Sequence, residues 1–401
     1  MFRQVRYSQY EGPADGVDLD ELVRHLQDFL LESGFNNDPW DPDPEAGRDF
    51  EDLLVAIAAA LAAGELVDPE LLSEAMDADD WLKTRLGELV RQLAQRLQEA
   101  GYVRFGQLGG DGSSGEPSRF ELTARAVNQL GHTALREIMG PGAGRIMGAH
   151  RANRPGSGVE VSSSSRPYSF GDSLSLDAHE TLRSAVRRAG PGGQVRIGHD
   201  DLYVHESELH TNAATVLMLD CSHSMILYGE DRFTPGKKVA LALARLIASQ
   251  YRGDYLRFVL FHDSAEEVTL PQLAGMQVGP FHTNTAEGIS LARRLLQRQT
   301  AGTRQIIMIT DGKPTAITLP GGRIYKNAYG QDAMVLKTTL AEVAACRRQG
   351  ITINTFMLAR DPALLAFVRR MTEMTGGRSY LTSADNVGQF VLQEFSRRRN
   401  R

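Results

Sequence analysis

The pattern of apolar residues changes near position 213. Beyond it, short runs of apolar and β-branched residues alternate with longer stretches of helical periodicity, and four such runs occupy 213–220, 255–261, 304–310 and 351–358. Strands that are apolar on both faces are typical of parallel sheets covered by helices on each side. We therefore predict an α/β fold over residues 213–395, with a doubly wound, mostly parallel, Rossmann-like sheet.

The remaining elements of this region complete the predicted sheet. The stretch AEEVTL at 265–270 follows the second strand so closely that we expect it to pair antiparallel at an edge. RSYLTS at 378–383 is expected to form the last strand. Three stretches of helical periodicity connect the strands, at 234–251, 285–299 and 332–350. Thr234 is expected to cap the first of these helices, with Pro235 at its first position.

Residues 1–139 have helical periodicity over most of their length. The predicted helices cover 18–34, 50–64, 68–76, 79–101 and 124–140. Two short stretches typical of strands, YVRF and RFELT, lie between the last two helices, so that residues 80–139 have the outline of a winged helix. We predict a largely α-helical N-terminal region before the α/β domain.

The segment 140–212 separates these two regions. Its first part is rich in Gly, Ser and Pro, a composition typical of a linker. A bridging segment follows, with one predicted helix at 177–190. The last residues, 396–401, are predicted to form a basic tail.

Acidic residues are concentrated in the N-terminal part of the chain. Residues 1–150 contain 27 Asp and Glu against 13 Lys and Arg, a net charge of −14, and the rest sums to +8, which gives the total of −6. A nucleic-acid-binding domain usually presents a basic face or helix. The acidic winged-helix outline therefore disfavours DNA binding, and nucleic acid is not an expected partner.

The cysteine content and the apolar runs indicate the compartment. Two cysteines, Cys221 and Cys346, are too few for a disulfide framework and fit a reducing environment. The first residues contain no apolar segment of the signal-peptide type. The longest apolar run, 53–63, is shorter than the roughly 20 residues that span a bilayer and is expected to form a buried helix. We therefore expect a cytoplasmic protein without a membrane partner.

Polar side chains follow the predicted strands at their carboxyl ends. Asp220, Ser222 and Ser224 come at the end of the first strand. Thr283 precedes a helix, and Asp311 follows the third strand. Alternate residues of an extended chain point the same way, so the first three side chains can aim at one point. Ligands of open parallel sheets bind outside the carboxyl ends of the strands, and we expect all five side chains to meet there.

Two carboxylates and three hydroxyls are hard oxygen ligands, which favour Mg²⁺ or Mn²⁺ over zinc. We expect the isolated protein to bind either ion weakly. His223, His262 and His282 could instead form a zinc site, but they lack ligand spacing. A Ser222 nucleophile with His223 as its base is disfavoured, because adjacent strand residues diverge and the chain has no G-x-S-x-G elbow. We expect no catalytic residues and no enzymatic activity.

Three motifs occur in a fixed order along the chain: D-x-S-x-S after the first strand, TNTAEGI before a helix, and ITDG at the end of a later strand. Together they resemble the von Willebrand factor A (vWA) domain with its metal-ion-dependent adhesion site, over residues 213–395. The resemblance implies that Ser222, Ser224 and Thr283 ligate the ion directly. It implies that Asp220 and Asp311 act directly or through water. The loop ILYGEDRFTPG departs from the family pattern and is long enough to form part of a partner surface.

The stretches YSFGDSLSLDAHETLRSAVRR and VRIGHDDLYVHESE resemble bacterial intracellular proteins with a C-terminal vWA domain and a helical N-terminal region. Such proteins are often linked to MoxR-type AAA+ ATPases or to chelatase-like metal-insertion machinery. The resemblance implies a non-enzymatic, divalent-metal-dependent protein-binding module that acts as an adaptor or cofactor of an AAA+ ATPase. The partner is expected to supply an acidic residue to the metal. A non-catalytic subunit of a metal-chelatase-like complex and a DNA-associated regulator remain as alternatives.

Overall fold

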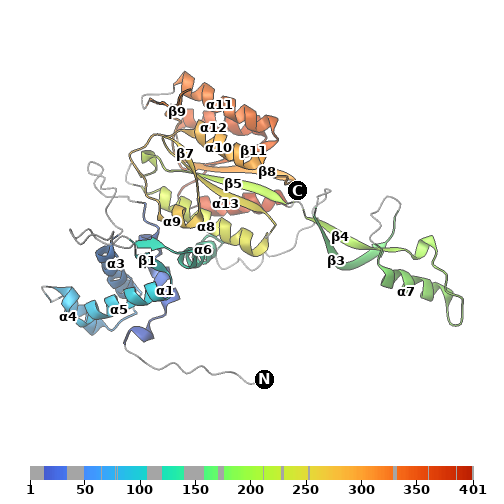
Figure 1. Cartoon of the computed structure of the whole chain (residues 1–401), viewed down its shortest axis with the longest axis horizontal. Helices are drawn as coiled ribbons and strands as arrows, with labels where there is room; N and C mark the ends of the chain where they lie inside the picture. Colours follow the sequence, from blue (N-terminus) through green and yellow to red (C-terminus); the bar gives the residue numbers. More distant parts are fainter. Residues whose placement is uncertain are drawn as a thin grey trace.

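The fold comes from a computed structural model that describes residues 13–33, 49–105, 120–139, 158–169, 176–327 and 332–399, apart from positions 65, 77, 79, 211, 227–229, 252, 360 and 385. The chain consists of a helical N-terminal region, an arm of two strands and one helix, and a C-terminal α/β domain (Figure 1).

The α/β domain is built around a six-stranded sheet with the order β12-β11-β8-β5-β6-β7. Neighbouring strands are parallel, except that β6 and β7 pair antiparallel. The strands span Ala213–Asp220 (β5), Tyr255–Phe261 (β6), Ala265–Val268 (β7), Thr303–Thr310 (β8), Ile351–Met357 (β11) and Ser379–Leu381 (β12). The predicted α/β fold is confirmed, including the antiparallel edge strand and the last strand.

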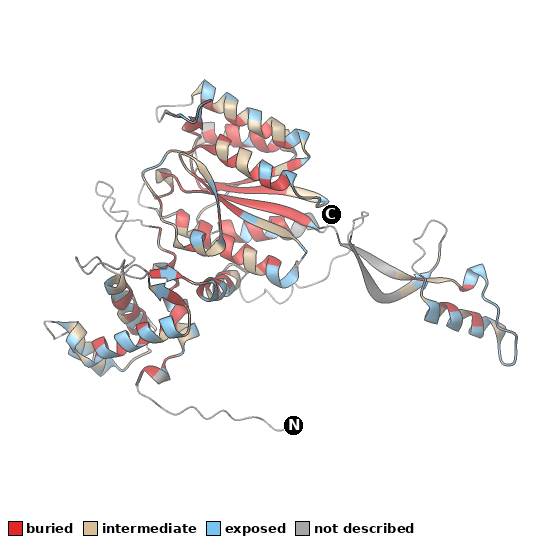
Figure 2. Cartoon of the chain, viewed as in Figure 1, coloured by how far each residue is buried: buried red, intermediate tan, exposed pale blue. Residues whose placement is uncertain are grey.

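Helices cover both faces of this sheet (Figure 1). The covering helices are α8 (Phe233–Gln250) and α13 (Val387–Arg399) on one face, and α10 (Thr285–Gln297), α11 (Ala333–Arg348) and α12 (Pro362–Thr375) on the other. Side chains alternate along β5, so Leu217 and Leu219 pack in the first layer and Val216 and Met218 in the second. All eight residues of β5 are buried, as the red strands of Figure 2 show, which explains why all of them except Thr215 and Asp220 are apolar.

Helix α8 begins at Phe233, so Thr234 does not cap it and Pro235 is its third residue; both predictions were wrong. The Asp231 carboxylate accepts hydrogen bonds from the backbone N–H groups of Phe233 and Thr234 at 2.9 and 3.0 Å. The Thr234 hydroxyl donates instead to the carbonyl of Leu31, in the N-terminal region, at 3.1 Å. A tertiary contact therefore uses the hydroxyl that local sequence rules assign to the cap.

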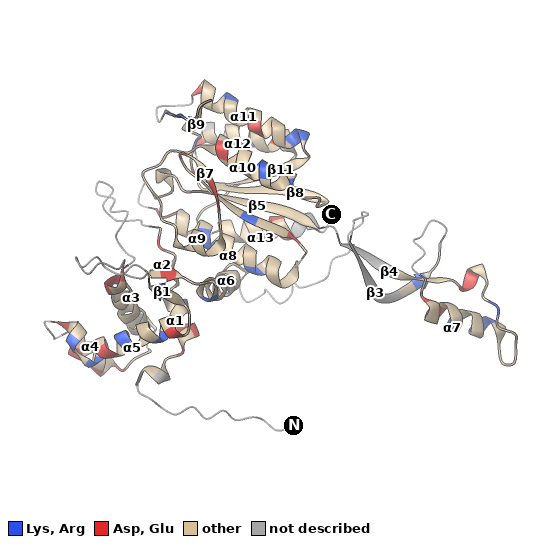
Figure 3. Cartoon of the chain, in the orientation of Figure 1, with Lys and Arg blue, Asp and Glu red and all other residues tan. Residues whose placement is uncertain are grey.

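The helices of the N-terminal region are α1 (Leu19–His25), α2 (Gln27–Leu30), α3 (Phe50–Ala63), α4 (Pro69–Met76), α5 (Arg85–Glu99) and α6 (Ala124–Met139). Helix α4 carries acidic residues and α5 carries residues of both signs, and the Arg85–Glu74 ion pair at 2.8 Å joins the two helices (Figure 3). The helix predicted over 18–34 is divided at Leu26 and ends at Leu30. The chain leaves the helix there because the next residues contact the α/β domain, and the Ser33 carbonyl accepts from the Val278 N–H at 2.8 Å.

Strands β1 (Val103–Phe105) and β2 (Phe120–Leu122) pair antiparallel between α5 and α6. This is the order of elements that the winged-helix outline requires. The expected wing-like loop lies outside the described residues. Both strands contribute buried residues, including Val103 and Phe120, to the core that α1, α3 and α5 also form.

The N-terminal region and the α/β domain meet where α6 packs on α8. Gly131 of α6 makes this close approach possible, because a Cβ there would lie 3.0 Å from the carbonyl oxygen of Leu241. Beside it, the fully buried Lys237 of α8 donates from Nζ to the carbonyls of Leu31 and Glu32 at 3.1 and 3.0 Å. It also donates to the carbonyl of Ala274 at 3.3 Å. We call this set of contacts the Lys237 clamp.

The arm consists of β3 (Gly158–Pro167), β4 (Tyr203–His210) and α7 (Ala178–Ala189), and it extends away from the other two regions (Figure 1). The predicted helix at 177–190 is present, with the Asp177 side chain as its N-cap. The Arg188–Asp201 ion pair, at 2.7 Å, ties the end of α7 to the turn before β4. Segment 176–210, predicted as part of a bridge, is therefore folded rather than a simple connector.

Shorter elements complete the chain: 3-10 turns at Pro13–Gly16, Trp81–Lys83, His199–Asp201 and His223–Ile226, helix α9 (Leu270–Gly275), and strands β9 (Ala316–Thr318) and β10 (Ile324–Lys326). Helix α13 continues to Arg399, so most of the predicted basic tail is helical. None of the helices in the described residues is both long and apolar enough to span a bilayer.

Candidate functional site

The site lies at the carboxyl ends of β5 and β8, the neighbouring strands between which the direction of the chain connections reverses. Asp220 is the last residue of β5, and Ser222 follows it. Ser224 lies in the 3-10 turn His223–Ile226, not in extended chain. The expectation that strand alternation aligns all three side chains was wrong in this detail, but the turn still places Ser224 Oγ 3.0 Å from Ser222 Oγ.

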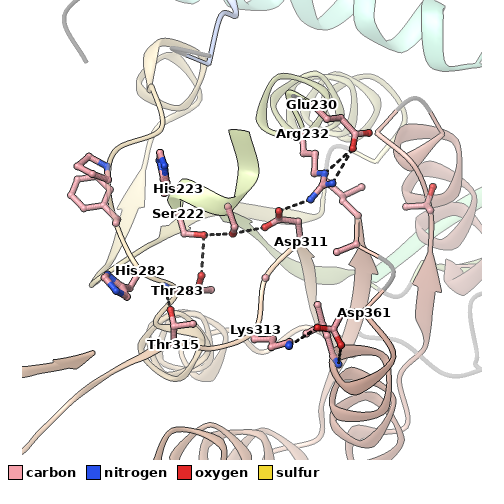
Figure 4. Close-up of a pocket in the computed structure, with 18 of the residues that line it drawn as sticks. Ser222, His223, Glu230, Arg232, His282, Thr283, Asp311, Lys313, Thr315 and Asp361 are labelled. Atoms are coloured by element: carbon pink, nitrogen blue, oxygen red, sulfur yellow. Dashed lines mark hydrogen bonds and ion pairs between the residues drawn. The ribbon is translucent and has the colours of Figure 1, made fainter. Parts of the chain in front are cut away.

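Three hydroxyl oxygens form a cluster at this edge of the sheet (Figure 4). Thr283 Oγ1 lies 2.9 Å from Ser222 Oγ, which in turn lies 3.0 Å from Ser224 Oγ. Thr283 comes directly before α10 and is held by a hydrogen bond from its N–H to Thr315 Oγ1 at 3.0 Å. The structure thus brings the Thr283 hydroxyl to those of Ser222 and Ser224, which lie 61 and 59 positions before it in the chain.

Asp220 is fully buried behind this cluster. Its Oδ1 accepts from the Ser222 N–H at 3.0 Å, and its Oδ2 accepts from Thr310 Oγ1 at 2.5 Å. Burial, together with the charge of nearby Asp311, raises the pKa of Asp220 to about 7. The carboxylate form of Asp220 is therefore costly without a compensating cation.

Asp311, on the β8 side of the site, is the second buried carboxylate. Its Oδ1 accepts from Ser224 Oγ at 2.7 Å, and its Oδ2 accepts from Arg232 Nη1 at 2.8 Å. Burial raises the pKa of Asp311 above its usual value, although Ser224 and Arg232 oppose this. All five residues that the sequence predicted for the site are therefore linked by one network.

Sequence reasoning did not assign Arg232 to the site. Its side chain is 13% exposed and joins Asp311 to Glu230, whose Oε2 accepts from Nε and Nη2 at 3.0 Å each (Figure 4). Arg232 and Glu230 belong to the loop before α8, which the sequence indicated only as a long departure from the vWA pattern. The opposite charge of Arg232 and Asp311 could have suggested the pair, but 79 positions separate them.

The oxygen cluster fits an octahedral hard cation. Ligands at 2.0–2.1 Å and at right angles stand about 3 Å apart, which matches the two hydroxyl spacings of 2.9 and 3.0 Å. Gly312 keeps the space beside them open. A Cβ on Gly312 would lie 3.0 Å from Ser224 Oγ, 3.3 Å from Thr283 Oγ1 and 3.8 Å from Asp220 Oδ2. The chemistry and the spacing of these donors therefore suit Mg²⁺ or Mn²⁺.

The alternative chemistries draw little support from the geometry. His223 and His282 line the pocket, whereas His262 stacks on Phe281 with ring centroids 4.6 Å apart. Within the described part of the chain, no three His, Cys, Asp or Glu side chains gather in the way that a zinc site with His ligands would require. Cys221 is buried, as expected, and its Sγ contacts the carbonyl of Gln277 at 3.4 Å.

A pocket of about 930 Å³ opens above the hydroxyl cluster. Cationic side chains at its wall include Arg232 and Lys313, and Lys313 pairs with Asp361 (Figure 4). The pocket is large enough for a side chain of another molecule to reach Ser222 and Thr283.

Sheet order, helix layers and the residues at the carboxyl edge define the C-terminal part as a vWA domain. Residues 213–396 match the family model of the vWA domain of Rv0959-like proteins. Residues 160–207 match the model of the third domain of the same proteins, which agrees with the folded arm.

Relatives that match nearly the whole of this chain are found in mycobacteria. The uncharacterized proteins Rv0959 of Mycobacterium tuberculosis and Mb0984 of Mycobacterium bovis are each 29% identical to this chain over 408 residues. The match covers 98% of this chain and 59% of either relative, so the chain spans less than two thirds of their length.

Solved structures with similarity to this chain include pilus and vWA proteins. The pilus adhesin SpaC of Lactobacillus rhamnosus GG is 16% identical with a TM-score of 0.37, covering 47% of this chain and 30% of its own. The SpRpn10 vWA domain is 15% identical with a TM-score of 0.34, covering 45% and 95%.

Proposed function

We propose that the protein is a divalent-metal-dependent protein-binding module without catalytic activity. Ser222, Ser224 and Thr283 hold Mg²⁺ or Mn²⁺ directly. Asp220 and Asp311 hold it directly or through water. The observation that carries this proposal is the cluster of three hydroxyl oxygens, spaced by 2.9 and 3.0 Å, in front of two buried carboxylates.

A bound Mg²⁺ would supply an electrophilic position that accepts an anionic oxygen from outside the chain. The three hydroxyls are neutral, so the proposed ligands contribute at most two negative charges to the ion, those of Asp220 and Asp311. Asp220 and Asp311 orient Ser222 and Ser224 from behind, through the hydrogen bonds at 3.0 and 2.7 Å. The residues of this chain thus leave one side of the cluster, toward the pocket, for a foreign ligand.

The ligand that suits this position is a Glu or Asp side chain of a partner protein. The pocket of about 930 Å³ admits a side chain, and the charge that favours a carboxylate there is that of the bound ion, because Lys313 and Arg232 at the wall are already paired with Asp361, Glu230 and Asp311. The partner class that we propose is a AAA+ ATPase of the MoxR type, with this protein as its adaptor or cofactor. That class rests on the resemblance of the bridging segment, and a cytoplasmic location is proposed with it.

The metal site is tested by titrating Mg²⁺ and Mn²⁺ into the full chain by calorimetry. Thr283→Ala removes one hydroxyl without changing the charge and is expected to weaken binding at least tenfold, while the melting temperature without metal stays close to that of the wild type. Thr338→Ala is the matched control, because its hydroxyl bonds within α11 to the Met334 carbonyl. Equal metal affinity of the wild type and Thr283→Ala would contradict the assignment.

The partner is tested by retention of a AAA+ ATPase on the immobilised full chain in Mg²⁺. EDTA and Thr283→Ala are each expected to release the ATPase, and Thr338→Ala is expected to retain it. Retention that persists in excess EDTA would mean that recognition does not pass through the metal.

A further inference from the structure

Arg232 places a permanent positive charge against the proposed metal ligands. Its Nη1 donates to Asp311 Oδ2 at 2.8 Å, and Asp311 Oδ1 accepts from Ser224 Oγ. The guanidinium is thus one residue removed from the hydroxyl cluster. An arginine cannot lose its proton in the accessible pH range, so this charge is always present.

The position of Arg232 is fixed from both sides. Its backbone N–H donates to the carbonyl of Met225 at 2.9 Å, and Met225 lies in the turn that carries Ser224. Glu230 binds Nε and Nη2 from the solvent side, while Asp311 binds Nη1 from the interior. The side chain is therefore pre-organised on Asp311 and does not sample the pocket freely.

The charge of Arg232 has opposite effects on the site without metal and with metal. Without metal, Arg232 offsets one of the two buried carboxylates, Asp220 and Asp311. With a divalent cation present, the same guanidinium repels the ion in a site of low dielectric constant, where charges a few ångströms apart interact strongly. Arg232 therefore stabilises the empty site and opposes the filled one.

We propose that Arg232 is a resident competitor of the metal, which lowers the intrinsic affinity of the site for divalent cations. The inference rests on the proposed function, because it concerns the same metal position. It explains how two carboxylates can be buried in the absence of metal. It also means that the metal is held firmly only when an incoming carboxylate adds its negative charge.

The test measures Mn²⁺ binding to the full chain from the EPR signal of free Mn²⁺. Arg232→Gln removes the charge and is expected to bind Mn²⁺ about tenfold more tightly or better. Arg232→Lys keeps the charge and should stay within a few-fold of the wild type. Glu230→Gln removes the counter-charge at an exposed position and should bind Mn²⁺ more weakly than the wild type.

A merely structural role of Arg232 would lower the melting temperature without tightening Mn²⁺ binding. The inference therefore requires two effects of Arg232→Gln: a lower melting temperature without metal, and a larger increase in melting temperature on adding Mn²⁺. If Arg232→Gln and the wild type bind Mn²⁺ equally, the inference fails and the proposed function stands. If neither binds Mn²⁺, both fail. If Arg232→Gln does not fold, Glu230→Gln decides: weaker Mn²⁺ binding than the wild type supports the inference, and equal or tighter binding contradicts it.

Discussion

At the scale of single residues, the site combines groups that ordinary packing would not place together. Asp220 and Asp311 are both buried, and burial raises the pKa of each. Sequence patterns identify these carboxylates and the hydroxyls because each follows a recognisable strand or precedes a helix. They do not identify Arg232, because its relation to Asp311 depends on the path of a loop and not on any periodicity.

The raised pKa of Asp220 predicts how stability without metal depends on pH. Its pKa is 3.8 in the unfolded chain and about 7 in the folded one, so the folded state binds the extra proton between these values. The free energy of unfolding should therefore fall as the pH rises from about 4 to about 7, by up to about 4 kcal/mol from this group. Urea unfolding in EDTA measures the slope.

Asp220→Asn is the matched variant for this pH dependence. It should flatten the profile while leaving a smaller slope from Asp311, whose pKa is raised for the same reason, with Arg232 opposing. It should also fold without metal, since the amide avoids the charge. An unchanged slope in Asp220→Asn would show that another group is responsible.

Gly312 gives a second prediction at this scale. A methyl group there would stand 3.0 Å from Ser224 Oγ and 3.3 Å from Thr283 Oγ1. Gly312→Ala should therefore weaken Mn²⁺ binding at least tenfold and should lower stability by only about 1–3 kcal/mol, the usual cost of overpacking. Mn²⁺ titration and thermal melting of one sample check both parts, and tight binding by Gly312→Ala would exclude a metal beside this glycine.

At the scale of elements, predictability follows the strength of the local pattern. The strands β5, β6, β8 and β11 were predictable because their burial between two layers of helices makes most of their residues apolar or β-branched. The helix over 18–34 was predicted too long, because its last carbonyls serve as acceptors for the α/β domain. The Ser224 turn was missed for another reason: nothing in the local sequence distinguishes a 3-10 turn from extended chain there.

The arm should be much less protected than the α/β domain. Helix α7 buries only Thr181 and Ala185, whereas α10 buries seven residues, from Thr285 to Leu296. Elements with few buried contacts open locally at low cost. Hydrogen exchange followed by mass spectrometry should show α7 exchanging at least tenfold faster than α10. Equal protection of the two helices would mean that the arm is covered, for example by another chain.

At the scale of the whole molecule, the N-terminal region and the site are joined by a short path. Leu31 and Glu32 contact α8 through the Lys237 clamp, and the Ser33 carbonyl accepts from the N–H of Val278, in the segment that leads to Thr283. The site is thus flanked on two sides by chain that the N-terminal region holds. Sequence reasoning placed a boundary between these regions and could not show that they share buried contacts.

Lys237→Met tests this connection. It keeps an aliphatic side chain but leaves the carbonyls of Leu31, Glu32 and Ala274 without this donor, which should cost about 1–3 kcal/mol of unfolding free energy. Lys238→Met is the control, because Lys238 pairs with the exposed Asp28 and should cost less than about 1 kcal/mol. Urea unfolding compares the two, and equal losses would show that the clamp adds nothing.

The Lys237 clamp also bears on how this protein can be divided for experiment. The match to the vWA family model begins at residue 213. A fragment that starts there lacks the carbonyls of Leu31 and Glu32, which accept hydrogen bonds from Lys237. It also uncovers Leu241, whose side chain belongs to the N-terminal core. The segment that matches the vWA model is therefore smaller than the unit within which Lys237 and Leu241 are buried. Fragments intended for crystallisation or for partner screening should keep the N-terminal helices, or replace Lys237 and Leu241 by residues that tolerate water.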